Sequence, residues 1–470
     1  MARQEDMEQE NLNEEVTSVG EFVVVPGPIT STIFIEARIS KDWSDIWELQ
    51  EALQARLSSP DNDSAVEVGD DIMVNPDASV TLGQLFETYK DIIESLKVVE
   101  YVGLETATCY TLNTVTVKLQ AYQLYDTERE EDTAIPQAES SFMPHVRFDG
   151  QWDELVFESD LKAELIWIMT NILRFSQRSG AGSRDINPLI LLYGPPGTGK
   201  TTLCQGLAQK ISIRLNSSYK QTKLIQIKTA NLLSKYYSES AKQVDNIFTT
   251  ITRMCQDDPE RFICVLIDEV ESIAYSREHS TSNGEAQDSL RATNSLLTGL
   301  DRAKGLANVI FLCTSNMVGS LDTAFLDRCG LRIAINPPSN AAQYTIIRGR
   351  IQKLIDQGHI TSEKSLPLYD EAYIEYRADG DGPMAKIGAK ILAILQLINS
   401  GNAHSSRGIS GRSLTQLPEL AILRYLRGED CDIDQALDFI KRFVISQESQ
   451  TVQHRGHKRT HSQVDEEFGR

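Results

Sequence analysis

A short glycine-rich run in the middle of the chain has the residue types that bind phosphate. GPPGTGKT fits the spacing G-x-x-x-x-G-K-[ST], with an apolar run, LILLY, before it and a helix-like run, TLCQGLAQKI, after it. Glycine lets backbone N–H groups curl round phosphate oxygens, and the following helix presents its positive end. We expect the lysine to reach the β- and γ-phosphates of a nucleotide, and the last threonine to ligate Mg²⁺. The residues of this predicted phosphate loop are Gly194, Pro195, Pro196, Gly197, Thr198, Gly199, Lys200 and Thr201.

Two acids follow a second apolar run, FICVLIDEVES. Asp268 is expected to hold Mg²⁺ across from Thr201, and Glu269 to polarise a water for in-line attack on the γ-phosphate. An acidic pair at a strand end is common surface decoration when it stands alone. After a phosphate loop it is better explained by catalysis, because ligands bind at the carboxyl ends of parallel strands.

Asn316 ends another apolar run, VIFLCTSN. Its amide could orient the attacking water or contact the γ-phosphate. The alternative is an asparagine that caps a turn, and only the neighbouring motifs favour the catalytic interpretation.

Five short apolar runs are the predicted strands that position these groups, at residues 189–193, 223–228, 262–267, 309–314 and 331–335. Runs this apolar indicate strands buried on both faces. Helical patterns separate most of them, so the predicted fold class is α/β, a parallel sheet with helices on both faces. A C-terminal α-helical domain follows.

The N-terminal region mixes two kinds of pattern and is predicted to be an α+β domain. IFIEARI and NTVTVKLQAYQLY resemble strands, whereas DWSDIWELQEALQARL and LGQLFETYKDIIESL have helical spacing. The predicted organisation is a disordered acidic arm at 1–18, an α+β domain at 19–126, a linker at 127–147, a large α/β domain at 148–336, a small helical domain at 337–447 and a disordered tail at 448–470.

Composition narrows the functional classes. The 470 residues are 41% hydrophobic and 24% charged, with a net charge of −21, which argues against a general nucleic-acid coat. No apolar run is long enough to cross a bilayer, and the acidic N-terminus does not resemble a secretory signal. The seven cysteines form no C-x-x-C pair, so we expect reduced core thiols rather than zinc ligands or disulfides.

The motif set GPPGTGKT, IDEVES, TSN and DTAFLDR resembles the AAA+ ATPases over residues 150 to 447. The resemblance implies ATP and Mg²⁺ as ligands, a homohexamer, and a strand order that places Asn316 between the phosphate loop and the acidic pair. It also implies that Arg328 acts as an arginine finger in the site of a neighbouring subunit. Many members have a second arginine where this chain has Leu331.

A closer resemblance is to the pachytene checkpoint protein family, also called thyroid-hormone-receptor-interacting proteins. It is carried by FDGQWDELVFESDLK, LLSKYYSESAKQV, IDEVESI and GISGRSLTQLP. The resemblance implies threading and partial unfolding of HORMA-domain clients, met directly or through an adaptor that docks on the N-terminal domain. Lys235, Tyr236 and Tyr237 match the family's substrate-gripping pore loop, and Arg412 matches a sensor arginine that reaches the γ-phosphate of its own subunit. A nuclear, chromosome-associated location, with cytoplasm as a second one, follows from the same resemblance. The negative net charge and the lack of a long apolar run predict no direct nucleic-acid partner and no membrane partner.

Other functions fit the sequence less well. A DNA-directed AAA+ motor is disfavoured by the charge and by a pore loop with one lysine beside two rings. A general unfoldase of the microtubule-severing or proteasomal type shares the aromatic loop. The N-terminal domain of this chain and its SGR motif, which ends at Arg412, fit that class less well. A degraded ATPase that serves only as a scaffold is disfavoured because every catalytic position is filled.

Overall fold

The computed structural model of the chain separates into two compact units, and each is described by itself. One unit comprises Met1–Ala37 with Trp47–Leu119, and the other comprises Arg38–Ile46 with Gln120–Arg470. The structure describes residues 31–74, 80–103, 107–126, 135, 138–158, 160–179, 187–232, 240–276, 284–363, 365–380, 382, 385–401, 409–428 and 430–447. The predicted arm, the predicted tail and the candidate pore-loop residues Lys235, Tyr236 and Tyr237 lie outside these ranges.

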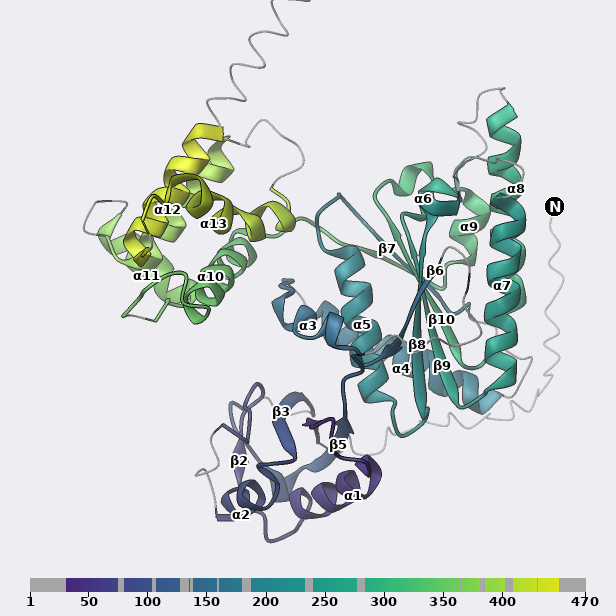
Figure 1. The fold of residues 1–470 in the computed structure, drawn as a ribbon, viewed down its shortest axis with the longest axis horizontal. Helices are drawn as coiled ribbons and strands as arrows, with labels where there is room; N and C mark the ends of the chain where they lie inside the picture. The colour runs from purple at the N-terminus through teal and green to yellow at the C-terminus, as the bar shows by residue number, and fades with distance from the viewer. Residues whose placement is uncertain are drawn as a thin grey trace, which may run out of the picture. The chain divides into compact units, whose positions relative to one another are not determined.

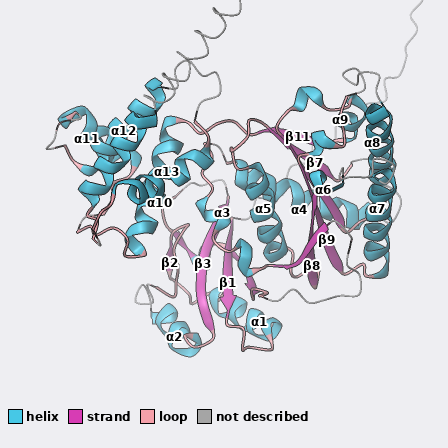
Figure 2. Cartoon of the chain, turned by 45° about the horizontal axis from the view of Figure 1, so that its top comes forward, coloured by secondary structure: helices cyan, strands magenta, loops and turns pink. Residues whose placement is uncertain are grey.

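The N-terminal unit is an α+β fold, as predicted. A three-stranded sheet has the order β3-β1-β5, and β2 pairs with β4 in a two-stranded one. Figure 2 shows β1 and β3 side by side, with the two helices beside them. The elements are β1 (Thr32–Ile39), α1 (Ile46–Leu57), β2 (Ala65–Val66), α2 (Val80–Tyr89), β3 (Ile93–Val102), β4 (Tyr110–Thr111) and β5 (Thr116–Tyr122).

One predicted helix in this unit is half wrong. Residues 82–96 were expected to be helical throughout, but α2 ends at Tyr89 and β3 begins at Ile93. Residues 93–102 are held as strand β3 by pairing with β1 and by backbone hydrogen bonds that Leu96 and Val98 form with residues 69–72. Such non-local pairing overrides the helical spacing of a short run.

The second unit holds a six-stranded sheet of order β11-β7-β10-β9-β8-β6, which Figure 1 shows between two layers of helices. The five predicted strands are confirmed within two residues at each end, and they pair in parallel. The elements up to β11 are β6 (Ala138–Met143), α3 (Gln151–Glu154), α4 (Leu161–Ser179), β7 (Leu189–Tyr193), α5 (Lys200–Arg214), β8 (Gln221–Lys228), α6 (Thr229–Leu232), α7 (Ser240–Asp257), β9 (Arg261–Asp268), α8 (Gly284–Ala303), β10 (Val309–Ser315), α9 (Thr323–Arg328) and β11 (Leu331–Ala334).

The two faces of this sheet pack into separate cores. Along β7, Leu189 and Leu191 join the core under α7 and α8, whereas Ile190 and Leu192 join the core under α4 and α5 (Figure 1). The alternation follows from the two-residue period of a strand. It explains why strands in this sheet read as continuous apolar runs.

The predicted linker 127–147 contains an edge strand. Ala138–Met143 forms β6, which pairs antiparallel with β8 from Ala138↔Ile227 to Met143↔Thr222. The first four residues, AESS, include no β-branched or aromatic side chain and give no strand signal. The backbone is recruited by the open edge of β8, which would otherwise carry unpaired N–H and C=O groups.

The small C-terminal domain is helical, as predicted. Its core includes Tyr344, Ile391 and Leu437, and Figure 1 shows its helices gathered as a bundle. Its elements are α10 (Asn340–Asp356), α11 (Tyr369–Asp379), α12 (Ile387–Gly401), α13 (Gly411–Tyr425) and a last helix at residues 433–447.

The cysteines behave mostly as core thiols. Cys204, Cys255, Cys264, Cys313 and Cys431 are buried, and burial raises the pKa of the Cys264 thiol to about 12. None of the seven, all of which lie in the described ranges, forms a disulfide, and Cys109 is exposed. Among the described helices, none is both long and apolar enough to cross a membrane.

Candidate functional site

The predicted phosphate loop connects the end of β7 to the start of α5. Two of its glycines are required by geometry. A Cβ at Gly194 would lie 2.1 Å from the Ile335 carbonyl oxygen, and Gly197 has φ of 78° and faces Ser410. Any larger residue would therefore displace either the neighbouring strand or the N-cap of α13.

Lys200 is buried, and its ammonium group donates three hydrogen bonds. The acceptors are the carbonyl oxygens of Gly194 and Pro195 and the Oδ1 atom of Asn316, each at 2.8 Å. Burial lowers the pKa of Lys200, and the carboxylates of Glu271, Asp268 and Glu269 oppose that shift. The Lys200 ammonium thus lies at the phosphate loop, where phosphate oxygens of a nucleotide would replace the Gly194 and Pro195 carbonyls as its acceptors.

The two predicted Mg²⁺ ligands lie in contact. Thr201 Oγ1 donates to Asp268 Oδ1 at 2.7 Å, and Thr314 donates to the same carboxylate oxygen. Hydroxyl and carboxylate oxygens are the donors that Mg²⁺ takes in nucleotide sites, with phosphate oxygens and water completing its shell. This pair therefore fits the ion, and among the described residues no group of three or more His, Cys, Asp or Glu side chains could hold a metal.

Glu269 has an unusual backbone. Its φ is 54°, and no other non-glycine residue within the described ranges has a positive φ. Hydrogen bonds from residues at the ends of the two neighbouring strands, β8 and β10, hold the backbone in this conformation. Thr314 on β10 accepts the Glu269 N–H at 3.0 Å, while Thr229, next to β8, donates to the Asp268 and Glu269 carbonyls at 2.9 Å each. Left-handed backbone at a non-glycine residue is typical of functional sites, and here it turns an exposed carboxylate into the pocket mouth.

Asn316 lies where the family resemblance implied. It follows β10, which is bracketed by the loop-bearing β7 and the acid-bearing β9. Its side chain accepts from Lys200, and its backbone N–H donates to Glu271 Oε1 at 3.0 Å. The carboxyl ends of three parallel strands thus bring the phosphate loop, the acids and the amide to one place.

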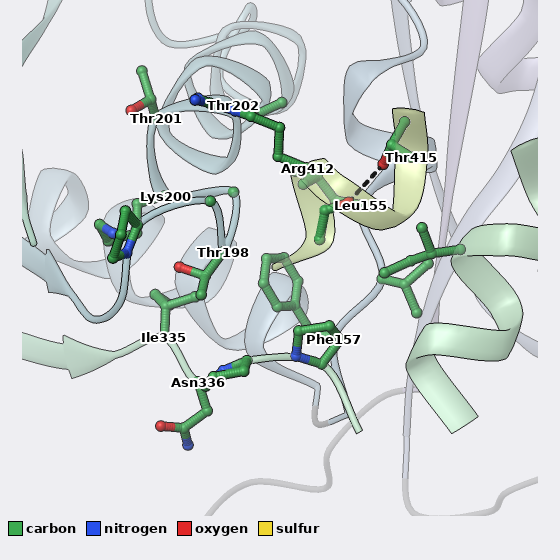
Figure 3. Close-up of a pocket in the computed structure, with 18 of the residues that line it drawn as sticks. Leu155, Phe157, Thr198, Lys200, Thr201, Thr202, Ile335, Asn336, Arg412 and Thr415 are labelled. Carbon is green, nitrogen blue, oxygen red and sulfur yellow. Dashed lines mark hydrogen bonds between the residues drawn. The ribbon is translucent and has the colours of Figure 1, made fainter. Parts of the chain in front are cut away.

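Arg412 lies at this site and Arg328 does not. The Arg412 N–H donates to the Gly197 carbonyl at 3.2 Å, and the residue lines the same pocket, as Figure 3 shows. Arg328 is absent from the pocket lining. Its guanidinium forms a two-pronged pair with Asp301, at 2.8 Å for each bond.

The pocket has an apolar side that the motif analysis missed. Leu155 and Phe157, from the segment between α3 and α4, line it together with Ile335 (Figure 3). Ile346 of α10 is also among the lining residues. Leu155 and Phe157 belong to LVF, a stretch too short to carry a periodic signal. They suit a flat, apolar group held beside the phosphate loop.

The geometry brings together Lys200, Thr201, Asp268, Glu269 and Asn316, and places Arg412 at their edge. Thr314, Thr229 and Glu271 were not singled out from the sequence, and all three contact the predicted residues. The roles assigned to all of these residues stay predictions.

Two family models match the chain. The model of the ATPase family associated with various cellular activities (AAA) matches residues 190–337, and the model of the TRIP13-like AAA+ ATPase lid C-terminal domain matches residues 339–448.

Relatives match over a longer stretch. The chain is 38% identical over 314 residues to the pachytene checkpoint protein 2 homolog of Arabidopsis thaliana, with 64% of this chain and 66% of that protein covered. It is 35% identical over 343 residues to the homolog of Sus scrofa, with 72% and 77% covered. The match thus spans just under two thirds of the Arabidopsis protein's length. Among solved structures, C. elegans PCH-2 aligns with a TM-score of 0.64 and 28% identity, covering 89% of this chain and 99% of that one.

Proposed function

Because the chain belongs to the pachytene checkpoint protein 2 family and carries an AAA ATPase domain with its lid, we propose that it couples ATP hydrolysis to the remodelling of a protein client. The observation that supports this best is the contact set at the pocket. Lys200 donates to Asn316 at 2.8 Å and Thr201 donates to Asp268 at 2.7 Å, so the loop that follows β7 is bonded to the carboxyl ends of both β10 and β9.

The chemistry assigned to these groups is phosphoryl transfer to water. The loop N–H groups and Lys200 neutralise charge on the β- and γ-phosphates. Thr201 and Asp268 would hold Mg²⁺, which supplies further charge neutralisation when bound. Glu269 takes a proton from the attacking water, and Asn316 orients that water or the γ-phosphate. The apolar side, with Leu155 and Phe157, receives the base.

The assembly we propose is a homohexamer. Arg328 would enter the site of the adjacent subunit as the arginine finger of that site. It lines no part of the pocket in its own subunit, and its side chain, which is 29% exposed, forms an ion pair with Asp301. Arg412 would serve its own subunit, which agrees with its place above Gly197. Leu331 leaves no second arginine at the expected spacing.

The client we propose is a HORMA-domain protein, threaded through a central pore and gripped by Lys235, Tyr236 and Tyr237. The family resemblance carries this proposal, and an aromatic ring suits it because a ring packs on any extended chain. The first 126 residues hold 24 acidic and 7 basic side chains, a difference of −17 out of −21 for the whole chain. A client or adaptor that docks on the N-terminal unit should therefore present basic residues. We place the protein in the nucleus, at chromosomes, with cytoplasm as a second location.

A substrate trap tests this function. Glu269→Gln keeps the size and polarity of the side chain but cannot act as a base, so the variant should bind ATP, turn it over slowly and retain its client. A pull-down with ATP, followed by mass spectrometry, should recover a HORMA-domain protein that the Lys200→Ala variant does not retain. Recovery of nucleic acid, or of unfolded proteins without a common domain, would contradict the proposed client.

A further inference from the structure

Glu271 is the third acid of the run IDEVES and lies in the short turn Val270–Ser272 that follows the acidic pair. Its Oε1 atom accepts the backbone N–H of Asn316 at 3.0 Å. Asn316 in turn accepts from the Lys200 ammonium at 2.8 Å. A chain of two hydrogen bonds therefore runs from this carboxylate through the Asn316 residue to the phosphate-binding lysine.

Glu271 lies behind the site rather than in it. Asn316, Asp268 and Glu269 line the pocket, but Glu271 does not. Its second oxygen, Oε2, is buried and has no hydrogen-bond partner among the described residues. Burying a half-satisfied carboxylate is costly, so a compensating interaction is required. The bond that its first oxygen, Oε1, accepts from the Asn316 backbone N–H supplies one.

We propose that Glu271 is a positioning residue for ATP hydrolysis, which fixes Asn316 against Lys200 by accepting the Asn316 backbone N–H. The inference rests on the proposed ATPase activity and not on the proposed client. Asn316 follows β10 directly, and the next residue, Met317, has an exposed side chain. The bond to Glu271 thus ties this strand end to the turn that carries the catalytic acids.

Two substitutions separate the hydrogen bond from the charge. Glu271→Gln removes the charge but keeps an oxygen at the same reach, so it should stay within about threefold of the unaltered kcat. Glu271→Asp keeps the charge but withdraws the carboxylate by one methylene, so its kcat should fall about tenfold or more, because small misplacements of reacting groups are costly. The dissociation constant for a fluorescent ATP analogue should change by less than about threefold in both.

The opposite pattern is an unchanged kcat in Glu271→Asp with a lowered kcat in Glu271→Gln. It would assign the effect of Glu271 to its charge rather than to its hydrogen bond, and would overturn the proposal. Equal effects of the two substitutions, whether both normal or both slow, would overturn it too, as would loss of nucleotide binding in Glu271→Gln. Glu260→Ala is the matched control, since this exposed glutamate precedes the other end of β9 and pairs only with exposed Lys220 among the contacts described. If the unaltered chain itself fails to hydrolyse ATP, the proposed function fails first and independently.

Discussion

Thr314 gives the most exacting test of how this site is built. Its hydroxyl donates to the Asp268 carboxylate and accepts the Glu269 N–H at 3.0 Å. Thr314→Val keeps the β-branched shape in β10 and removes both bonds. The buried strand position, with 2% exposure, gives water no room to replace the hydroxyl.

The cost can be worked from these two bonds. Losing a hydrogen bond to a charged carboxylate removes about 1.5–3 kcal/mol, and leaving a backbone N–H without an acceptor costs about 1–3 kcal/mol. The lower ends apply because Asp268 is half-buried and the Glu269 side chain is exposed, which gives a loss of about 2–3 kcal/mol. The backbone of Glu269 at φ of 54° also loses one of its restraints, so its carboxylate should leave the attacking position.

Thermal melting and steady-state phosphate release measure the two effects. Melting of the ATPase domain should fall by about 4–12 °C. The kcat should fall about tenfold or more while ATP binding persists, because Lys200 and the loop are untouched. Thr250→Val is the control, since among the described contacts its hydroxyl donates only an exposed bond to the Asn246 carbonyl one turn earlier in α7, and the change should stay within about 0.5 kcal/mol. Unchanged kcat in Thr314→Val would refute the argument that this hydroxyl holds Glu269 in place.

Tyr236→Ala should keep ATP hydrolysis and lose client remodelling, measured by the unfolding of a tagged client; full remodelling would contradict the pore-loop assignment. Arg328→Ala should abolish hydrolysis, and mixing it with Lys200→Ala should restore part of the activity, because each variant supplies what the other's interface lacks. No recovery at any ratio would argue against a finger acting in trans. The pH dependence of binding follows from Lys200, whose pKa lies below its usual 10.5 through burial. Its ammonium is lost at a lower pH than that of an exposed lysine, so affinity for an ATP analogue should fall as the pH is raised, before pH 10.5 is reached, and the fall should be absent in Lys200→Arg.

The inner strands β7, β9 and β10 of the central sheet were predictable because they are buried on both faces and therefore appear in the sequence as short apolar runs. β7, β9 and β10 have nearly the predicted bounds. The phosphate loop and the acidic pair were predictable for a related reason, since each follows directly from such a run. Local sequence determines both the strand and the residue at its end.

Features that depend on non-local partners were not predictable. β6 forms because β8 offers it an open edge, and β3 replaces the second half of an expected helix because it pairs with β1. Thr314, Thr229 and Glu271 have common residue types at unremarkable spacing. Their function is visible only when parallel pairing brings three strand ends together.

The measurement that tests the central claim most directly is phosphate release by the unaltered chain and by Glu269→Gln, with ATP-analogue binding measured on the same samples. We predict Mg²⁺-dependent turnover by the unaltered chain, and in Glu269→Gln unchanged binding with turnover reduced about 100-fold or more. Turnover in Glu269→Gln equal to that of the unaltered chain, with binding intact, would contradict the assignment of this pocket as an ATPase site driven by Glu269.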